Sequence, residues 1–141
     1  MSLPVGAIPA LDVDAHVTHT FSLADTTRFA ALNGDSNPIH TDVAFALAAG
    51  HPAPIVQGML SASLFATIFG KTIPGAVYVA QAFRWRQPLL VDEAVTASIR
   101  VVRLRKRFVD CETICRKTAT GEVVIEGQAT VLLPKPTTTT D

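Results

Sequence analysis

The sequence predicts one α+β domain in which an antiparallel sheet packs against a single long apolar helix. A charge-free stretch at 55–69 has the length and composition of a buried helix. From residue 76 onward, apolar and polar residues alternate with a period of two, which is typical of strands. Strands that follow one another without intervening helices form antiparallel sheets. With 141 residues, the chain is long enough for one domain with its own core.

A Pro- and Gly-punctuated arm at 1–15 precedes the first regular element, a short strand predicted at 16–21. A helix is predicted at 23–32, because Ser22 is a favourable N-cap and Asp25 can complete a capping box with it. The carboxylate of Asp25 also interacts favourably with the partial positive charge at the helix N-terminus.

The next prediction concerns the end of this helix and a second helix after it. Phe29 and Leu32 are expected to be the side chains that the first helix buries, and Asn33-Gly34 can form its C-terminal cap. A second short helix is predicted at 41–49, where a glycine follows. The segment between the two helices contains a proline and is therefore a shaped loop.

The segment 55–69 is the most apolar of the chain and ends before Gly70. Small residues lie on more than one side of the predicted helix, so close neighbours can surround it. At about 1.5 Å per residue it would be roughly 22 Å long. A membrane-spanning helix needs about 20 apolar residues, so a centrally buried helix is the better prediction.

Four strands are predicted after this helix, separated by turn signals such as Gln87-Pro88 and Thr120-Gly121. The domain is expected to end at residue 134, and the Thr-rich tail that follows is expected to be disordered. In numbers, the predicted strands are 76–87, 93–106, 108–118 and 122–133, the domain is 16–134 and the tail is 135–141.

The overall composition argues against a highly charged binding partner. Twelve basic and twelve acidic side chains cancel, so no nucleic-acid or membrane partner is expected. A mean hydropathy of +0.32 is consistent with a subunit interface that buries part of the apolar surface.

Cys111 and Cys115 would lie about 13 Å apart on a strand, which is too far for a disulfide. Reduced cysteines favour a cytoplasmic location, or an organelle if a targeting segment is missing.

The loop at 35–40, Asp-Ser-Asn-Pro-Ile-His, is the candidate reactive motif. Pro38 keeps Asn37 out of the α region, and the resulting bend lets Asp35 and His40 face the same point. A carboxylate and a neutral imidazole that share one water can position it, deprotonate it and return the proton. Taken alone, the loop also fits a simpler interpretation, in which Asp35 is a turn residue and His40 precedes a helix cap.

Three segments resemble the MaoC-like R-specific enoyl-CoA hydratases: 29–40, 54–59 (Pro-Ile-Val-Gln-Gly-Met) and 79–92. The resemblance implies a hot-dog fold, in which a curved antiparallel sheet wraps a long central helix. It also implies a homodimer or larger oligomer and no metal or organic cofactor. The implied reaction is hydration of trans-2-enoyl-CoA to (R)-3-hydroxyacyl-CoA, or the reverse dehydration, in fatty-acid metabolism.

The resemblance also assigns roles to residues. Asp35 and His40 would hold the catalytic water, and the backbone amide of Gly58 would polarise the thioester carbonyl. A helix N-terminus provides unpaired N–H groups for a developing enolate, and a residue without Cβ lets a carbonyl approach, although a packing glycine is the alternative. Family members often have His where this chain has Gln57, and some carry Ser where it has Ala66, so these two positions bear on substrate orientation.

Substrate-binding roles are predicted for Asn37, Gln57, Arg84 and Arg86. The two arginines begin the only basic concentration of the chain, which continues with Arg100, Arg103, Arg105, Lys106 and Arg107. Arginines that alternate on a strand usually form a solvated face, and the functional alternative is a clamp for the phosphates of coenzyme A.

Two other functions fit the same fold. A hot-dog thioesterase normally has an acidic residue on the central helix, and 55–69 has none. Ser61 and Ser63 lack the G-x-S-x-G context of a serine hydrolase. The other alternative is a non-catalytic subunit that binds acyl thioesters. The sequence leaves three properties open: whether coenzyme A or acyl carrier protein carries the acyl group, how long the acyl chain is, and in which direction the reaction runs.

Overall fold

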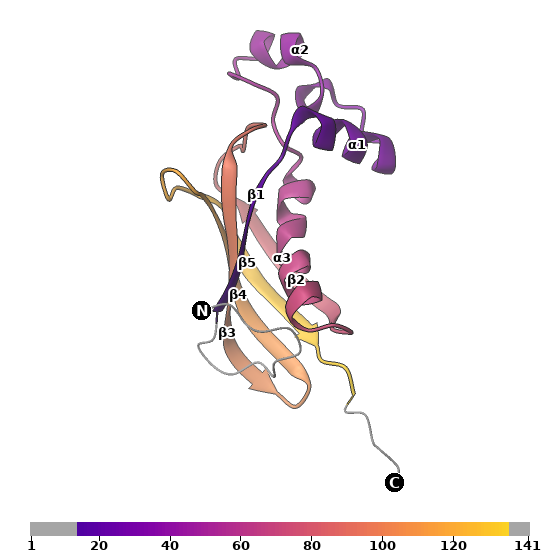
Figure 1. Cartoon of the computed structure of the whole chain (residues 1–141), viewed down its shortest axis with the longest axis vertical. Coiled ribbons are helices and arrows are strands. Elements are labelled where there is room, and N and C mark those ends of the chain that lie inside the picture. Colours follow the sequence, from indigo (N-terminus) through magenta and orange to yellow (C-terminus); the bar gives the residue numbers. More distant parts are fainter. Residues whose placement is uncertain (1–13, 136–141) are drawn as a thin grey trace.

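A five-stranded antiparallel sheet curls around one long helix, and two shorter helices lie beyond one end of the sheet (Figure 1). The computed structural model describes residues 14–135. In chain order the elements are β1 (Asp14–Thr20), α1 (Leu23–Asn33), the 3₁₀ turn η1 (Pro38–His40), α2 (Val43–Ala48), α3 (Gly58–Thr72), β2 (Val77–Trp85), β3 (Ala94–Arg105), β4 (Phe108–Lys117) and β5 (Val123–Leu132).

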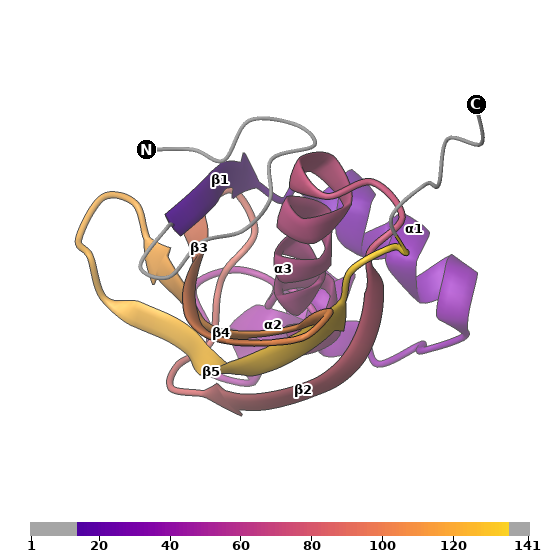
Figure 2. The same ribbon diagram turned by 90° about the horizontal axis from the view of Figure 1, so that it is seen from below.

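The strands lie in the order β1-β3-β4-β5-β2, and every neighbouring pair is antiparallel. β1 and β2 are therefore the two edges, and Figure 2 shows the sheet bending around α3 between them. The four C-terminal strands lie within two residues of their predicted bounds. The predicted α+β class, with a curved antiparallel sheet around a long central helix, is confirmed.

The core lies between α3 and the inner face of the sheet. Alternate residues of β3 are almost fully buried, as their period of two predicts. They belong to one hydrophobic cluster with the buried residues of α3, and its members include Val95, Ala97, Ile99, Val101, Phe65, Ile68 and Phe69. Burial of apolar surface contributes about 25 cal/mol per Å². This packing, more than helix propensity, holds α3 against the sheet.

The long helix is shifted by three residues toward the C-terminus relative to the predicted 55–69. It starts later because Ile55 forms an isolated β bridge with Leu90 and so has an extended backbone. It also continues past Gly70, so the predicted end there is wrong. The helix ends at Thr72, two residues before Pro74, because a proline disfavours the α conformation in the residue that precedes it.

The capping of α1 follows the prediction. The Ser22 hydroxyl accepts the backbone N–H of Asp25 at 3.2 Å, and the Asp25 carboxylate accepts the backbone N–H of Ser22 at 2.9 Å. This second hydrogen bond is the main reason that the pKa of Asp25 lies below its usual value. At the other end, Gly34 has the left-handed backbone of a C-terminal cap, with φ of 79°.

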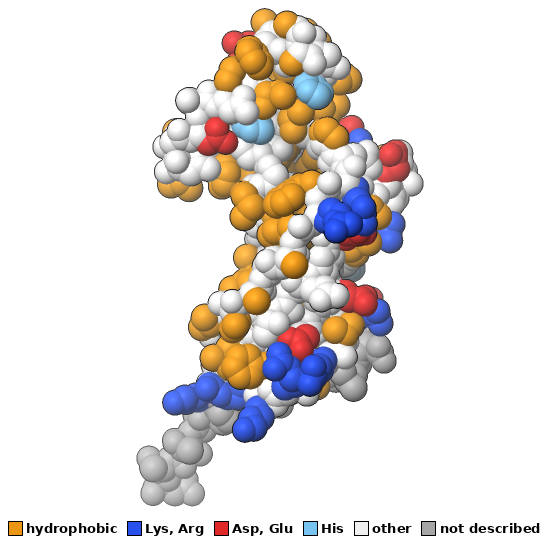
Figure 3. All heavy atoms as spheres, turned by 180° about the vertical axis from the view of Figure 1, so that it is seen from behind, with side chains coloured by type: hydrophobic (Ala, Val, Ile, Leu, Met, Phe, Trp, Pro, Cys, Tyr) orange, Lys and Arg blue, Asp and Glu red, His pale blue; other side chains and the backbone are white. Residues whose placement is uncertain are grey.

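The prediction for the buried face of α1 is wrong. Thr26 is its buried residue, Phe29 is half-buried, and Leu32 is 83% exposed. The reason is that α1 lies beyond the end of the sheet, where one chain offers little surface to cover it (Figure 1). Hydrophobic side chains also gather on the surface of this end (Figure 3). Val43, Phe45 and Leu47 of α2 are each about half exposed.

Helix α2 is shorter than the predicted 41–49, because Asp42 caps it by accepting the backbone N–H of Phe45 at 3.1 Å.

β1 begins two residues before the predicted strand, so the boundary of the arm at residue 15 is wrong. The remainder of the arm, and the tail from residue 136, lie outside the described residues. Within 14–135, no helix has the length and apolar character needed to cross a membrane.

The two cysteines lie on β4, and both are free. Burial raises the pKa of Cys111 and of Cys115 to about 12. Because the thiolate is the reactive form, burial disfavours reaction at both thiols. The predicted absence of a disulfide between them is confirmed.

Candidate active site

Three side chains at every second position shape the loop between α1 and α2. Each accepts the backbone N–H two residues later: Asn33 from Asp35 at 2.9 Å, Asp35 from Asn37 at 3.0 Å and Asn37 from Ile39 at 3.2 Å. Short polar side chains favour such turns over a continuing helix. The Asp35 Oδ1 atom is thereby fixed to the backbone, which leaves Oδ2 for a second partner.

The η1 turn carries His40 to the same side as Asp35. The His40 Nδ1 atom lies 2.7 Å from the carbonyl oxygen of Ile55. Because a carbonyl can only accept, Nδ1 carries the proton, and in the neutral ring Nε2 has a free lone pair. Nε2 lies 3.9 Å from Asp35 Oδ2. That separation is too long for a direct hydrogen bond and suits a water held by both groups.

The position of His40 depends on residues far along the chain. The N–H of Ile55 donates to the Ile39 carbonyl at 3.0 Å, and the N–H of Val56 donates to the Leu89 carbonyl at 2.8 Å. The loop is thus fastened both to the connection before α3 and to the segment after β2. As a result the His40 side chain is only 14% exposed, whereas that of Asp35 is 43% exposed.

Gly58 is the first residue of α3, so its N–H has no acceptor within the helix. The indole of Trp85 lies against it, and the indole N–H donates to the Gly58 carbonyl at 3.1 Å. A Cβ at position 58 would lie 2.8 Å from Trp85 Nε1. The lack of a side chain here therefore serves at least the packing against Trp85.

A cavity of about 370 Å³ lies beside this turn of α3. Its lining includes His40, Gly58, Ser61, Trp85 and Arg86, together with apolar side chains such as Val56, Leu89 and Val124. Asp35 does not line it, and its Oδ2 atom lies 3.9 Å from Nε2 of His40, which does. The site therefore combines an imidazole, a helix N-terminus and a mostly apolar wall, as an acyl group in need of polarisation would require.

Of the predicted substrate-binding residues, only Arg86 lines this cavity. Asn37 is exposed and uses its side-chain oxygen within the loop. Gln57 is 3% exposed, and its amide donates to the Thr26 carbonyl of α1 at 2.8 Å. Within the described part of the chain, its Oε1 atom has no hydrogen-bond partner. Arg84 is exposed and has no ion-pair partner among residues 14–135.

Several members of the basic concentration form ion pairs: Arg86 with Glu126, Arg100 with Glu112, and Arg105 with Asp110. Hydrogen bonds from Arg105 hold the pKa of Asp110 below its usual value. These pairs favour a solvated face for most of this surface. They do not involve Arg84.

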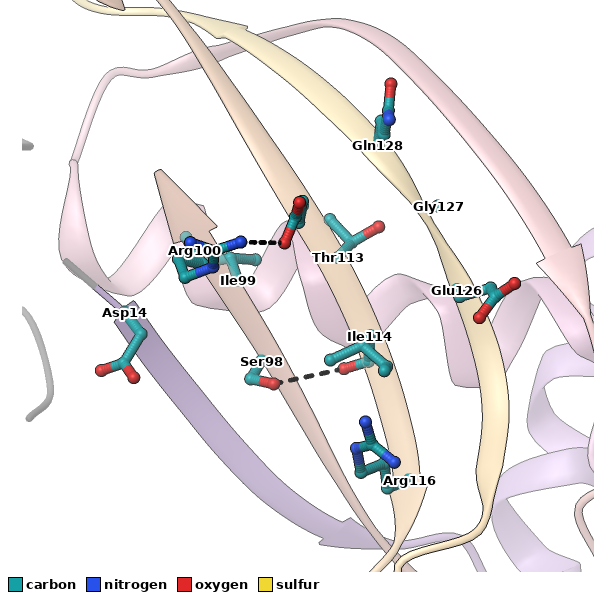
Figure 4. Close-up of a pocket in the computed structure, with 11 residues that line it drawn as sticks. Asp14, Ser98, Ile99, Arg100, Thr113, Ile114, Arg116, Glu126, Gly127 and Gln128 are labelled. Carbon is teal, nitrogen blue, oxygen red and sulfur yellow. Dashed lines mark hydrogen bonds and ion pairs between the residues drawn. The ribbon is translucent and has the colours of Figure 1, made fainter. Parts of the chain in front are cut away.

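A larger hollow, of about 540 Å³, lies on the outer face of the sheet, away from α3. Figure 4 shows Arg100 paired with a carboxylate and Ser98 directed toward the Ile114 carbonyl there. The hollow contains neither Asp35 nor His40, and charged groups of both signs line it. Across residues 14–135, no cluster of three metal-binding side chains occurs.

Sequence reasoning missed Trp85 as a site residue. Two features of the sequence could have indicated this role: Trp85 is the only tryptophan of the chain, and it lies between two arginines on a predicted strand. Ser61, which lacks the sequence context of a serine nucleophile, has a packing role in the helix. It is buried and donates to the Gly58 carbonyl at 3.0 Å.

Comparison with known proteins relates this geometry to a family. Residues 5–124 match the model of the MaoC like domain. An (R)-specific enoyl-CoA hydratase of Rhodospirillum rubrum is 38% identical over 85% of this chain and 85% of its own length. A mitochondrial 3-hydroxyacyl-[acyl-carrier-protein] dehydratase of Arabidopsis thaliana is 36% identical over 83% of this chain and 73% of its own.

The fold agrees with solved structures as well. The (R)-hydratase from A. caviae superposes with a TM-score of 0.85 at 35% identity, over 89% of this chain and 98% of that one. R-hydratase PhaJ1 from Pseudomonas aeruginosa also superposes with a TM-score of 0.85, at 28% identity, over 91% of this chain and 84% of that one. The predicted hot-dog fold is therefore confirmed, and the chain belongs to the MaoC-like family, whose members include hydro-lyases acting on acyl thioesters.

Proposed function

We propose that this enzyme hydrates trans-2-enoyl thioesters to (R)-3-hydroxyacyl thioesters, or catalyses the reverse dehydration, in fatty-acid metabolism. The observation that carries the proposal is the His40 side chain, with Nδ1 bound to the Ile55 carbonyl and Nε2 3.9 Å from Asp35 Oδ2. The named activities of the relatives from Rhodospirillum rubrum and Arabidopsis thaliana support the same reaction.

In this mechanism, Asp35 and His40 hold one water between them. The water oxygen forms a bond to C3 while its proton passes to His40 Nε2, and Nε2 then returns a proton to C2. Between these steps, negative charge lies on the thioester oxygen. The N–H of Gly58, at the positive end of the α3 dipole, would stabilise that charge.

The direct test is hydration of crotonyl-CoA by the full chain, followed by loss of the enoyl absorbance. The product should be the R enantiomer, which chiral chromatography of the released acid can identify. Release of free thiol without loss of the double bond would instead identify a thioesterase. Binding without any chemistry would identify a non-catalytic acyl-thioester-binding subunit.

The carrier of the acyl group is a further part of the proposal. Coenzyme A is favoured because Arg86 lines the cavity and Arg84, two residues before it, is an exposed arginine. Arg84→Glu is expected to raise the KM for crotonyl-CoA and to leave kcat nearly unchanged, because phosphate contacts are equal in ground and transition states. A crotonyl thioester that lacks the nucleotide should be unaffected. Equal losses with both substrates would show that the arginine is structural.

Arg86 needs its own control because it pairs with Glu126. Arg86→Glu would repel Glu126, whereas the double variant Arg86→Glu/Glu126→Arg keeps an opposite-charge pair. If the pair is structural, the double variant should recover the wild-type KM. If Arg86 itself contacts phosphate, the KM should stay raised. An unchanged KM in all three variants would favour acyl carrier protein as the carrier.

We also propose that the enzyme is a homodimer or larger. β2 is a sheet edge, and Val77, Tyr78 and Val79 on it are 58%, 36% and 52% exposed. Such an edge can pair with a second copy across a two-fold axis. The protein should sediment at twice the 15.0 kDa chain mass or more.

The assembly prediction has a matched pair of variants. Val77→Asp should weaken the assembly, whereas Val102→Asp, at a 41% exposed valine on the interior strand β3, should not. Sedimentation velocity at micromolar concentration measures both. An active 15.0 kDa monomer would contradict this proposal.

For the cell compartment, we propose the cytoplasm, with an organelle as the alternative. The two free, buried cysteines are compatible with a reducing compartment. The mitochondrial location in the name of the Arabidopsis thaliana relative supports the alternative. Fractionation of cells that express the full-length product would distinguish the two.

A further inference from the structure

The indole of Trp85 contacts the helix turn that the proposed function uses. Trp85 is the last residue of β2, lines the cavity and is 43% exposed. Its N–H donates to the Gly58 carbonyl at 3.1 Å. The ring lies so close that a Cβ on Gly58 would be 2.8 Å from Nε1 and 3.0 Å from Cε2.

The first turn of α3 lacks the usual side-chain cap. Its N-cap residue, Gln57, makes no capping hydrogen bond, because its amide is turned away to the Thr26 carbonyl. Other groups hold this turn instead. The Gly58 carbonyl accepts the Ser61 hydroxyl at 3.0 Å in addition to the Trp85 indole. Rotation of the turn would break the bond to Trp85, so this residue restricts where the free N–H of Gly58 can point.

Trp85 is itself held by the core on its other side. Its ring is tilted against Phe83 with 5.4 Å between centroids, and Phe83 stacks on the buried Phe65 at 5.8 Å. Such aromatic contacts each contribute beyond the area they bury. The row of three rings connects the core of the domain to the cavity wall, so the indole is a rigid support.

We propose that Trp85 is a positioning residue, which orients the Gly58 amide toward the thioester carbonyl and forms the apolar wall beside the enoyl group. This inference rests on the proposed function. The N–H of Gly58 matters most when negative charge develops on the carbonyl oxygen. Loss of its support should therefore lower the rate of the chemical step more than it weakens substrate binding.

Trp85→Phe tests the hydrogen bond, because it keeps an aromatic ring and removes the donor. With crotonyl-CoA, kcat should fall roughly 3- to 10-fold, the range for the loss of one neutral hydrogen bond, while KM changes by less than about twofold. Ser63→Ala is the control in the same helix as Gly58, since it removes the hydroxyl bond to the Leu60 carbonyl at an exposed residue that does not line the cavity. It should leave kcat unchanged. Wild-type kcat in Trp85→Phe would overturn the positioning role.

The second test uses Trp85 as the only tryptophan of the chain. Butyryl-CoA has a saturated acyl group that cannot be hydrated, and its binding should change the intensity and wavelength of the tryptophan emission. Unchanged emission at a concentration that calorimetry shows to be saturating would overturn the inference, whether or not crotonyl-CoA is hydrated. A changed emission in a wild-type protein that does not hydrate crotonyl-CoA would support the wall and refute the proposed function.

Discussion

Asp35→Asn and His40→Gln are each expected to lower kcat for crotonyl-CoA hydration by at least about 10², the usual effect of losing a general acid–base group. Asparagine keeps the shape of the Asp35 side chain and its acceptor for the Asn37 N–H, while the charge beside His40 is lost. Glutamine can still donate to the Ile55 carbonyl but has no basic nitrogen. The absorbance assay at saturating substrate measures both variants.

The two losses should be far from additive, because both groups act on one water. The double variant should therefore be little slower than the worse single variant. Asp42→Asn is a matched control, since Asp42 lies two residues beyond His40 and only caps α2. It should keep wild-type turnover. Near-normal kcat in a folded Asp35→Asn or His40→Gln variant would remove that residue from the mechanism.

Gly58→Ala is expected to lower kcat by up to about 10², which is the range for loss of an oxyanion-stabilising donor, because it keeps the backbone N–H of residue 58 but misplaces it. The new Cβ would lie 2.8 Å from Trp85 Nε1 and would have to displace either the indole or the first turn of α3. Thermal stability should also fall. Gly70→Ala is the control in the same helix, because a Cβ there meets nothing within 4 Å. It should keep its activity and gain about 0.5–1 kcal/mol of stability.

A double variant separates the two functions of Gly58. Trp85→Leu makes room for the Cβ, so Gly58→Ala should cost less thermal stability in the Trp85→Leu background than in the wild type. The kcat of the double variant should remain below that of Trp85→Leu alone if the absence of a Cβ is also needed for the thioester carbonyl to reach the Gly58 N–H. Equal kcat in the double variant and in Trp85→Leu would show that Gly58 serves only packing.

The sequence by itself determined the α+β class, the order of elements and the nature of the site loop. These follow from local rules: the period of two in β3, the capping box of Ser22 and Asp25, and the effect of Pro38 on the residue before it. The shape of the loop is also locally determined, because the side chains of Asp35 and Asn37 each accept a backbone N–H two residues later. Interactions within a few residues are readable from the chain.

Tertiary contacts decided the rest. The bridge between Ile55 and Leu90 moved the start of α3 to Gly58, and the Ile55 carbonyl determined which nitrogen of His40 carries the proton. Trp85 contacts Gly58 although it lies 27 residues later in the chain, and no local sequence pattern predicts this contact. Leu32 has the periodicity of a core residue, yet it is exposed because its helix extends past the sheet. Periodicity says which side chains share a face, and only the packing of distant elements decides whether that face is covered.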